Sequence, residues 1–70
     1  MTSYTVHLNG KDTKEWVAQC WTFEDAERFA VDIAQRRGHK TAVRSSDGDL
    51  VIYAPDGFVS SAFVNGRIVA

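Results

Sequence analysis

The chain has 70 residues, 44% of them hydrophobic, and its eight basic and nine acidic residues give a net charge of −1. This length fits one domain, residues 1–70, and leaves little room for both a core and a deep substrate cleft, so we expect no enzyme. A dedicated nucleic-acid binder is usually distinctly basic, and the near-neutral charge counts against that class. We expect a cytoplasmic protein without membrane contact, because the chain has neither a signal-peptide pattern nor an apolar run of membrane-spanning length.

The first two predicted elements form a hairpin. Residues 4–8 alternate apolar and polar side chains, which is typical of a strand with one buried face. Residues 10–14 are polar and contain Gly10, so they predict a turn, and residues 15–22 are rich in aromatic and apolar side chains, which predicts a second strand. Alternation in this strand separates two sets of side chains, Trp16, Ala18 and Cys20 on one face and Val17, Gln19 and Trp21 on the other.

A helix follows, with Thr22 as its N-cap and Asp25 three residues later. Gly38 comes directly after Arg36 and Arg37, a pattern typical of a helix C-terminus. The buried face is predicted from residues that recur at helical spacing, namely Phe23, Ala26, Phe29, Ala30, Ile33 and Ala34. Water is predicted to meet Glu24, Arg28, Val31 and Gln35. We expect Phe29 and Ile33 to anchor the helix to the sheet.

The C-terminal half predicts a meander of strands at residues 40–46, 49–54 and 58–64, with a stub at residues 67–70. Asp47-Gly48 and Asn65-Gly66 are typical of two-residue hairpin turns. Pro55-Asp56-Gly57 fits a three-residue loop with a bulge at Gly57. The chain is therefore predicted to be an α+β domain, an antiparallel sheet of four to six strands with a single helix packed on one face, in the order β-β-α-β-β-β.

These turn lengths predict which side chains share a face. They place Val43 opposite Ile52, Ser45 opposite Leu50 and Ala54 opposite Phe58. The face under the helix then carries Val43, Leu50, Ile52, Ala54, Phe58, Ala62 and Val64. The opposite, open face carries Arg44, Val51, Tyr53, Val59 and Phe63, and Trp21 also lies away from the helix. A slip of one residue would exchange the two faces.

An apolar open face has three explanations, which the sequence leaves open. The face is a contact between two copies of the chain, a contact with another protein, or a surface covered by the N-terminal loop and the C-terminal stub. Exposed apolar patches usually indicate contact with a partner, so we expect Trp21, Arg44, Tyr53, Val59 and Phe63 to contribute to binding.

Catalytic and metal sites are not predicted. His7, His39 and Cys20 share no ligand spacing, Cys20 sits in an apolar strand where an inert thiol is the simpler interpretation, and the glycines are explained by turns. As the only cysteine, Cys20 excludes an internal disulfide. We expect no cofactor.

Two charged clusters each have two interpretations. The basic cluster, which consists of Arg36, Arg37, His39, Lys40 and Arg44, is either a phosphate-contacting patch or a complement to the helix dipole that also aids solubility. Asp47, Asp49 and Asp56 either serve their turns, which favour Asp before Gly, or belong with the helix carboxylates to an acidic surface that docks on a basic nucleic-acid channel. We include these three aspartates among the candidate binding residues.

The chain resembles two groups of small proteins. Trp16-Val17, Phe23 with Ala26, residues 34–38, and Leu50-Val51-Ile52 with Asp56-Gly57 resemble a family of small bacterial domains of unknown function, which implies a fold and no activity. Residues 4–8, the helix through Arg37 and the hairpin of residues 51–58 resemble, in order and size, small phage-encoded anti-CRISPR proteins that inhibit the type I Cascade complex.

The second resemblance implies a non-enzymatic inhibitor that binds a CRISPR effector complex in the host cytoplasm and blocks its target DNA. The alternative, from a different class, is a small nucleic-acid-binding domain that uses Arg44, Tyr53 and the basic residues 36–40. Because the net charge is near zero, we expect weak or no direct binding to bare DNA and RNA.

Overall fold

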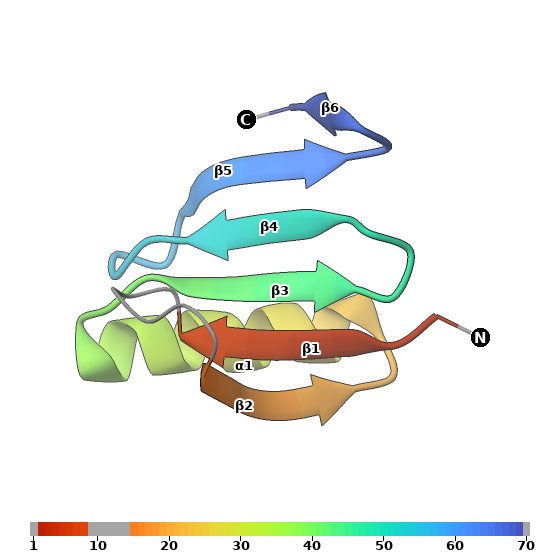
Figure 1. The fold of residues 1–70 in the computed structure, drawn as a ribbon. Helices are drawn as coiled ribbons and strands as arrows, with labels where there is room; N and C mark the ends of the chain where they lie inside the picture. The colour runs from red at the N-terminus through yellow and green to blue at the C-terminus, as the bar shows by residue number, and fades with distance from the viewer. Residues whose placement is uncertain (1, 9–14, 70) are drawn as a thin grey trace.

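The structure is a computed structural model that describes residues 2–8 and 15–69, with side chains from residue 18 onward in the second segment. Its elements are β1 (Tyr4–Leu8), β2 (Glu15–Cys20), α1 (Phe23–Arg37), β3 (Thr41–Ser45), β4 (Leu50–Tyr53), β5 (Val59–Val64) and β6 (Arg67–Ile68). They build one helix and one six-stranded antiparallel sheet in the order β2-β1-β3-β4-β5-β6 (Figure 1). This confirms the predicted α+β class, with the stub as a sixth strand. The turn predicted at residues 10–14 and the faces predicted for Trp16 and Val17 lie outside the described part.

Both ends of α1 lie where the capping residues predicted them. At the start, the backbone N–H of Asp25 donates a hydrogen bond of 3.2 Å to Oγ1 of Thr22, which has extended backbone angles. At the end, Gly38 has a φ of 65°, and its N–H donates to the carbonyl oxygen of Ala34 at 2.9 Å. Glycine adopts this left-handed conformation without a Cβ clash, so it closes the helix at low cost.

The buried stripe of α1 differs from the predicted one, because alanines occupy its centre. Ala26, Ala30 and Ala34 are fully buried, whereas Phe29 remains 40% exposed. The prediction that Phe29 anchors the helix is therefore wrong. Small side chains let the helix backbone approach the sheet closely, and the larger side chains then lie on the flanks of the contact. Val31, predicted to face water, is half-buried and packs against the core.

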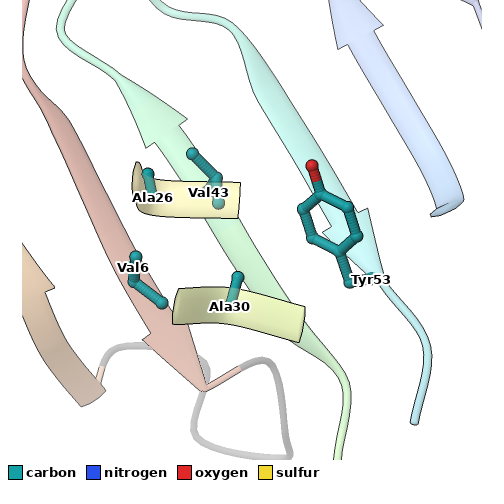
Figure 2. Packing of buried hydrophobic residues seen from close by; sticks show 5 residues of the cluster. All are labelled: Val6, Ala26, Ala30, Val43 and Tyr53. Carbon is teal, nitrogen blue, oxygen red and sulfur yellow. The ribbon is translucent and has the colours of Figure 1, made fainter. Parts of the chain in front are cut away.

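The core lies between α1 and the strands β1, β3 and β4. Val6, Val43 and Tyr53, one from each strand, pack around Ala26 and Ala30 of the helix (Figure 2). Thr41 is also fully buried, and its hydroxyl donates a hydrogen bond of 2.8 Å to the carbonyl oxygen of Ala30. This bond satisfies the polar group that burial would otherwise leave without a partner.

The turn between β3 and β4 differs from its prediction, and the difference exchanges the faces of β4. The N–H of Ser45 donates to the carbonyl of Asp49, so the loop consists of Ser46, Asp47 and Gly48 rather than of two residues. Gly48 takes a φ of 99°, as the last position of such a loop requires. Val43 consequently pairs with Val51 instead of Ile52, and the pairing slips by one residue.

This slip corrects several predicted positions. Tyr53 is only 2% exposed and belongs to the core, and Val51 packs against the core, although both were predicted on the open face. Leu50 and Ile52 were predicted under the helix but lie on the open face, since each alternates with a core residue along β4.

An irregularity in β5 restores part of the predicted arrangement. Tyr53 pairs with Val59, but Ile52 pairs with Ser61, so the chain inserts one extra residue between them. Such a bulge shifts the following side chains to the other face. Phe63 therefore pairs with Leu50 on the open face as predicted, while Val59 shares the helix side with Tyr53, contrary to its prediction. The loop at residues 55–57 and the two-residue turn at Asn65-Gly66 form as predicted.

Candidate interaction surfaces

One row of paired residues crosses the whole open face, the sheet face turned away from α1. Its members are backbone partners in successive strands, in the order Gln19, Thr5, Arg44, Leu50, Phe63 and Ile68. Directly paired residues of antiparallel strands point to the same side. The row is therefore polar over β2, β1 and β3 and apolar over β4, β5 and β6.

The apolar end forms the open-face patch, which we define as Leu50, Ile52, Phe63 and Ile68. These side chains, with Ser61 and Ala62, line a hollow of about 150 Å³. Phe63 is 42% exposed and Ile68 is 81% exposed. The water-facing side of an antiparallel sheet ordinarily carries polar residues, so this patch is unusual for a surface that meets only water.

At the polar end of the open face, Thr5 contacts His7. The hydroxyl of Thr5 lies 2.8 Å from Nε2 of His7, within hydrogen-bond distance. Burial, and then the positive charge of Arg44, lower the pKa of His7 below its ordinary value of 6.5. The His7 side chain therefore stays neutral near neutral pH, and Arg44 supplies the positive charge beside the open-face patch.

The predicted binding residues do not form one site. Arg44 and Phe63 lie on the open face, separated in their row by Leu50. Trp21 is 65% exposed but lies between β2 and the N-cap of α1. Tyr53 and Val59 lie on the helix side of the sheet.

The three predicted aspartates each accept hydrogen bonds near hairpin turns. Oδ1 of Asp49 accepts from the N–H of Asn65, and Oδ1 of Asp56 accepts from the N–H of Phe58. Oδ2 of Asp47 accepts from the hydroxyl of Thr2 at 2.9 Å. The Asp56 contact lies within its own turn and matches the turn-forming interpretation, whereas Asp47 and Asp49 contact residues outside the turn in which they lie.

A second surface lies on the helix side, between α1 and the β4–β5 region. We call it the α1 groove; it has a volume of about 710 Å³ and is lined by Glu24, Glu27, Arg28, Val31, Asp32, Gln35, Tyr53, Gly57, Phe58 and Val59. The hydroxyl of Tyr53 donates a hydrogen bond of 2.8 Å to Oε2 of Glu27. Burial and this hydrogen bond raise the pKa of Tyr53 above its ordinary value.

Sequence reasoning did not identify four residues of these surfaces as binding residues: Leu50, Ile52 and Ile68 of the open-face patch, and Phe58 of the α1 groove, which was predicted on the helix side but as part of the core. Leu50 and Ile52 were predicted on the helix side because the predicted register of β4 was wrong by one residue. Ile68 was not considered because residues 67–70 were predicted only as a stub. The hydrogen bond between Tyr53 and Glu27 was not predictable, because the predicted register placed Tyr53 on the open face, away from the helix.

An ion pair lies on α1, and the cysteine packs against the core. Nε of Arg36 lies 3.1 Å from Oδ1 of Asp32, one turn earlier in α1. Cys20 is a free, half-buried thiol that packs against the core. Among the described residues, no group of three or more His, Cys, Asp or Glu side chains is placed to hold a metal ion. No helix in the described ranges has the length and apolar character needed to cross a membrane.

No protein-family model, no curated protein and no solved structure matches this chain.

Proposed function

We propose that the protein is a non-enzymatic inhibitor that docks on a CRISPR effector complex through its open-face patch. The observation that carries the docking is the exposure of Phe63 and Ile68 beside Leu50 and Ile52, around a hollow on the sheet face turned away from α1. Contiguous exposed apolar side chains favour protein contact over free solvation. The class of partner follows from the resemblance to anti-CRISPR proteins in element order and size.

The surroundings of the patch suit a protein partner. Arg44 lies next to Leu50 in the cross-strand row, and Thr5 follows beyond it. Protein interfaces commonly have an apolar centre with a polar rim, and arginine and aromatic residues are enriched in them. Phe63 therefore serves as the central anchor, and Arg44 as the charged contact at the margin.

The test uses a bacterial strain with an active type I CRISPR system that is challenged with a targeted phage. Expression of the protein should restore phage growth, and the Phe63→Ser/Ile68→Ser variant should lose this effect. Trp21→Ser is the matched control, because Trp21 is equally apolar and 65% exposed but lies outside the patch. In vitro, the protein should co-purify with the effector complex and reduce its binding to target DNA. Failure of the wild-type protein to do either would reject the proposal.

A second copy of the chain is the competing occupant of the patch. Sedimentation velocity of the purified protein over a range of concentrations distinguishes the two. A dimer that dissociates in the Phe63→Ser/Ile68→Ser variant, without inhibition of any effector complex, would assign the patch to self-association.

Direct nucleic-acid binding is the second candidate function, and the observation that favours it is the placement of Arg44 and Phe63 on one open sheet face. Small RNA-binding sheets stack bases on such aromatic side chains. Tyr53 cannot take part as the sequence predicted, because it is buried. The net charge of −1 predicts little affinity at physiological salt. A mobility shift with low-micromolar affinity that is lost in Arg44→Ala would favour this function instead.

A further inference from the structure

The helix side of the sheet has room for a second helix. Within the described residues, no Cα atom of α1 comes within 8 Å of a Cα atom of β5 or β6, whereas α1 approaches β1, β2, β3 and β4. In Figure 1 the helix accordingly lies behind β1, β2 and β3, and the strands β5 and β6 extend beyond it. Three neighbouring strands span about 10 Å, which is the diameter of one helix with its side chains. The strip that runs from β4, which α1 covers only in part, across β5 to β6 is therefore about one helix wide.

Most of the floor of this strip is apolar, although Ser45 and Asp49 also line its far end and Arg67 of β6, the partner of Val64, adds a cation at its outer edge. In the α1 groove, Phe58 is 74% exposed and Val59 is 47% exposed. Farther along the same side of β4 and β5, Val51 and Val64 line a neighbouring hollow of about 230 Å³, together with Phe23 of α1. β5 has six residues. At about 3.3 Å per residue, they offer about 20 Å of surface, which a helix of about 13 residues would cover.

One end of the groove is closed. Gly57 lies so near α1 that a Cβ atom there would come within 2.8 Å of Nε2 of Gln35 and 3.4 Å of Cγ1 of Val31. Nε2 of Gln35 also lies 3.5 Å from the carbonyl oxygen of Asp56, at the long limit of a hydrogen bond. An occupant therefore extends from this end toward Glu24, in the first turn of α1.

The α1 wall of the groove is predominantly acidic. It contributes the carboxylates of Glu24, Glu27 and Asp32 and the cation of Arg28, and because Asp32 is paired with Arg36 at 3.1 Å, the excess negative charge lies at Glu24 and Glu27. The hydroxyl of Tyr53 holds the Glu27 carboxylate at the edge of the core, at 2.8 Å. Fixed negative charge beside an apolar floor is complementary to an occupant that is apolar on one face and basic at its margin.

The backbone favours a helical occupant over an extended one. The groove lies on the face of the sheet rather than at its edge, and the N–H and C=O groups of β4 are directed to β3 and β5. An extended peptide on this face would find no backbone partners, whereas a helix satisfies its own backbone groups internally. We propose that the α1 groove binds an amphipathic helix of a partner protein, with an apolar stripe against Val59 and Phe58 and with Lys or Arg side chains toward Glu24 and Glu27.

The probe for this inference is a synthetic helical peptide of about 14 residues with leucines at the i, i+3, i+4 and i+7 positions and lysines elsewhere. A peptide of the same pattern with glutamates in place of the lysines is its counterpart. Fluorescence anisotropy should show saturable binding of the lysine peptide and none of the glutamate peptide. Added salt should weaken the binding, because screening reduces the attraction.

Two pairs of variants locate the binding. Glu24→Lys and Asp25→Lys make the same charge change in the first turn of α1, but only Glu24 lines the groove. Phe58→Ser and Phe63→Ser remove exposed phenylalanines from the groove and from the open-face patch, respectively. Glu24→Lys and Phe58→Ser should weaken binding about tenfold, and their controls less than about twofold. Circular dichroism of each variant checks that the fold is retained.

The inference would be overturned by no binding of the lysine peptide, by equal binding of both peptides, or by equal losses in the groove variants and their controls. Loss of binding in Phe63→Ser alone would show that the peptide binds the open-face patch, and this result would also reject the groove as its binding site. Failure of the groove inference can be told apart from failure of the proposed function, since the latter rests on the open-face patch and is measured by phage growth and binding to the effector complex rather than by peptide binding.

Discussion

The two halves of the sheet differ in how much of each the helix covers. Over β1 and β3, the helix buries Val6, Val43 and the alanines of α1 almost completely. Over β5, Val59 on the helix side is still 47% exposed, and on the open face of the same half Phe63 and Ile68 are 42% and 81% exposed. The boundary is β4, because its Tyr53 lies in the core beneath α1, whereas no Cα atom of the next strand, β5, comes within 8 Å of the helix among the described residues. One half of the molecule therefore holds most of the folding energy, and the other half carries the surfaces that are free to bind.

The largest effect is expected from a test of this comparison that replaces one aromatic residue in each of two neighbouring strands. Tyr53→Ala should destabilise the fold by about 3–5 kcal/mol, because it leaves a cavity and removes the partner of Glu27. Phe63→Ala should cost less than about 1 kcal/mol, since Phe63 is already 42% exposed. Urea denaturation followed by circular dichroism measures both changes. Similar costs for the two variants would show that the halves do not differ in this way.

A second test concerns the close approach of α1 to the covered half. Ala30→Leu should destabilise the protein by about 1–3 kcal/mol, because the side chain of Ala30 is fully buried and the larger one has no space. Arg28→Leu, on an exposed position of the same helix, is the control, since arginine and leucine have similar helix propensities. If Ala30→Leu were neutral in thermal denaturation, the helix would not lie as close to the sheet as the alanine stripe indicates.

A third test addresses the turn of residues 55–57, which joins the uncovered half to α1. Gly57 and Gly48 have similar positive φ values of 92° and 99°, but only Gly57 lies against the helix. Gly48→Ala should cost about 1 kcal/mol from backbone strain alone. Gly57→Ala should cost about 1–2 kcal/mol, because its Cβ also displaces Gln35. Equal denaturation midpoints would mean that the turn does not press on the helix.

The smallest effect is expected at the polar end of the open face. Because the folded state lowers the pKa of His7, the unfolded chain binds this proton more readily. The stability contributed by neutral His7 is complete above its ordinary value of 6.5 and decreases as the pH falls below it. The thermal midpoint should therefore fall slightly between about pH 7.5 and about pH 5.5, and His7→Gln should remove part of that fall. An unchanged slope in His7→Gln would assign the pH dependence to other groups.

Local chemistry made much of the fold predictable. Thr22 and Gly38 set the ends of α1, and Asn65-Gly66 sets a two-residue turn, because in each case the residue itself forms the bond or adopts the positive φ. The faces of β4 were not predictable in the same way. Asp47-Gly48 fits a two-residue and a three-residue loop equally well, and a choice between them exchanges every side chain of the strand.

The predicted composition of the candidate surfaces depended on the same choice of loop length. Arg44 and Phe63 were placed correctly on the open face, the latter because the bulge in β5 compensates for the slip in β4. Tyr53 and Val59 were placed on the wrong side because they pair before the bulge and so keep the uncompensated slip. Alternation along a strand gives no sign of a bulge, since the extra residue changes the phase without changing the composition.

The strand order also determines how the chain can fold. Every described strand pairing except β1 with β3 joins strands that are consecutive in sequence, and α1 lies between the two strands of that exception. Hairpins close short loops quickly, whereas the β1–β3 pairing must enclose β2 and the helix within its loop. The folding rate should therefore depend on the contact of Val6 with Val43, which are paired across these strands. Truncation of either side chain should slow folding more than an equally costly change in β5, because the β5 hairpin can form before that closure or after it.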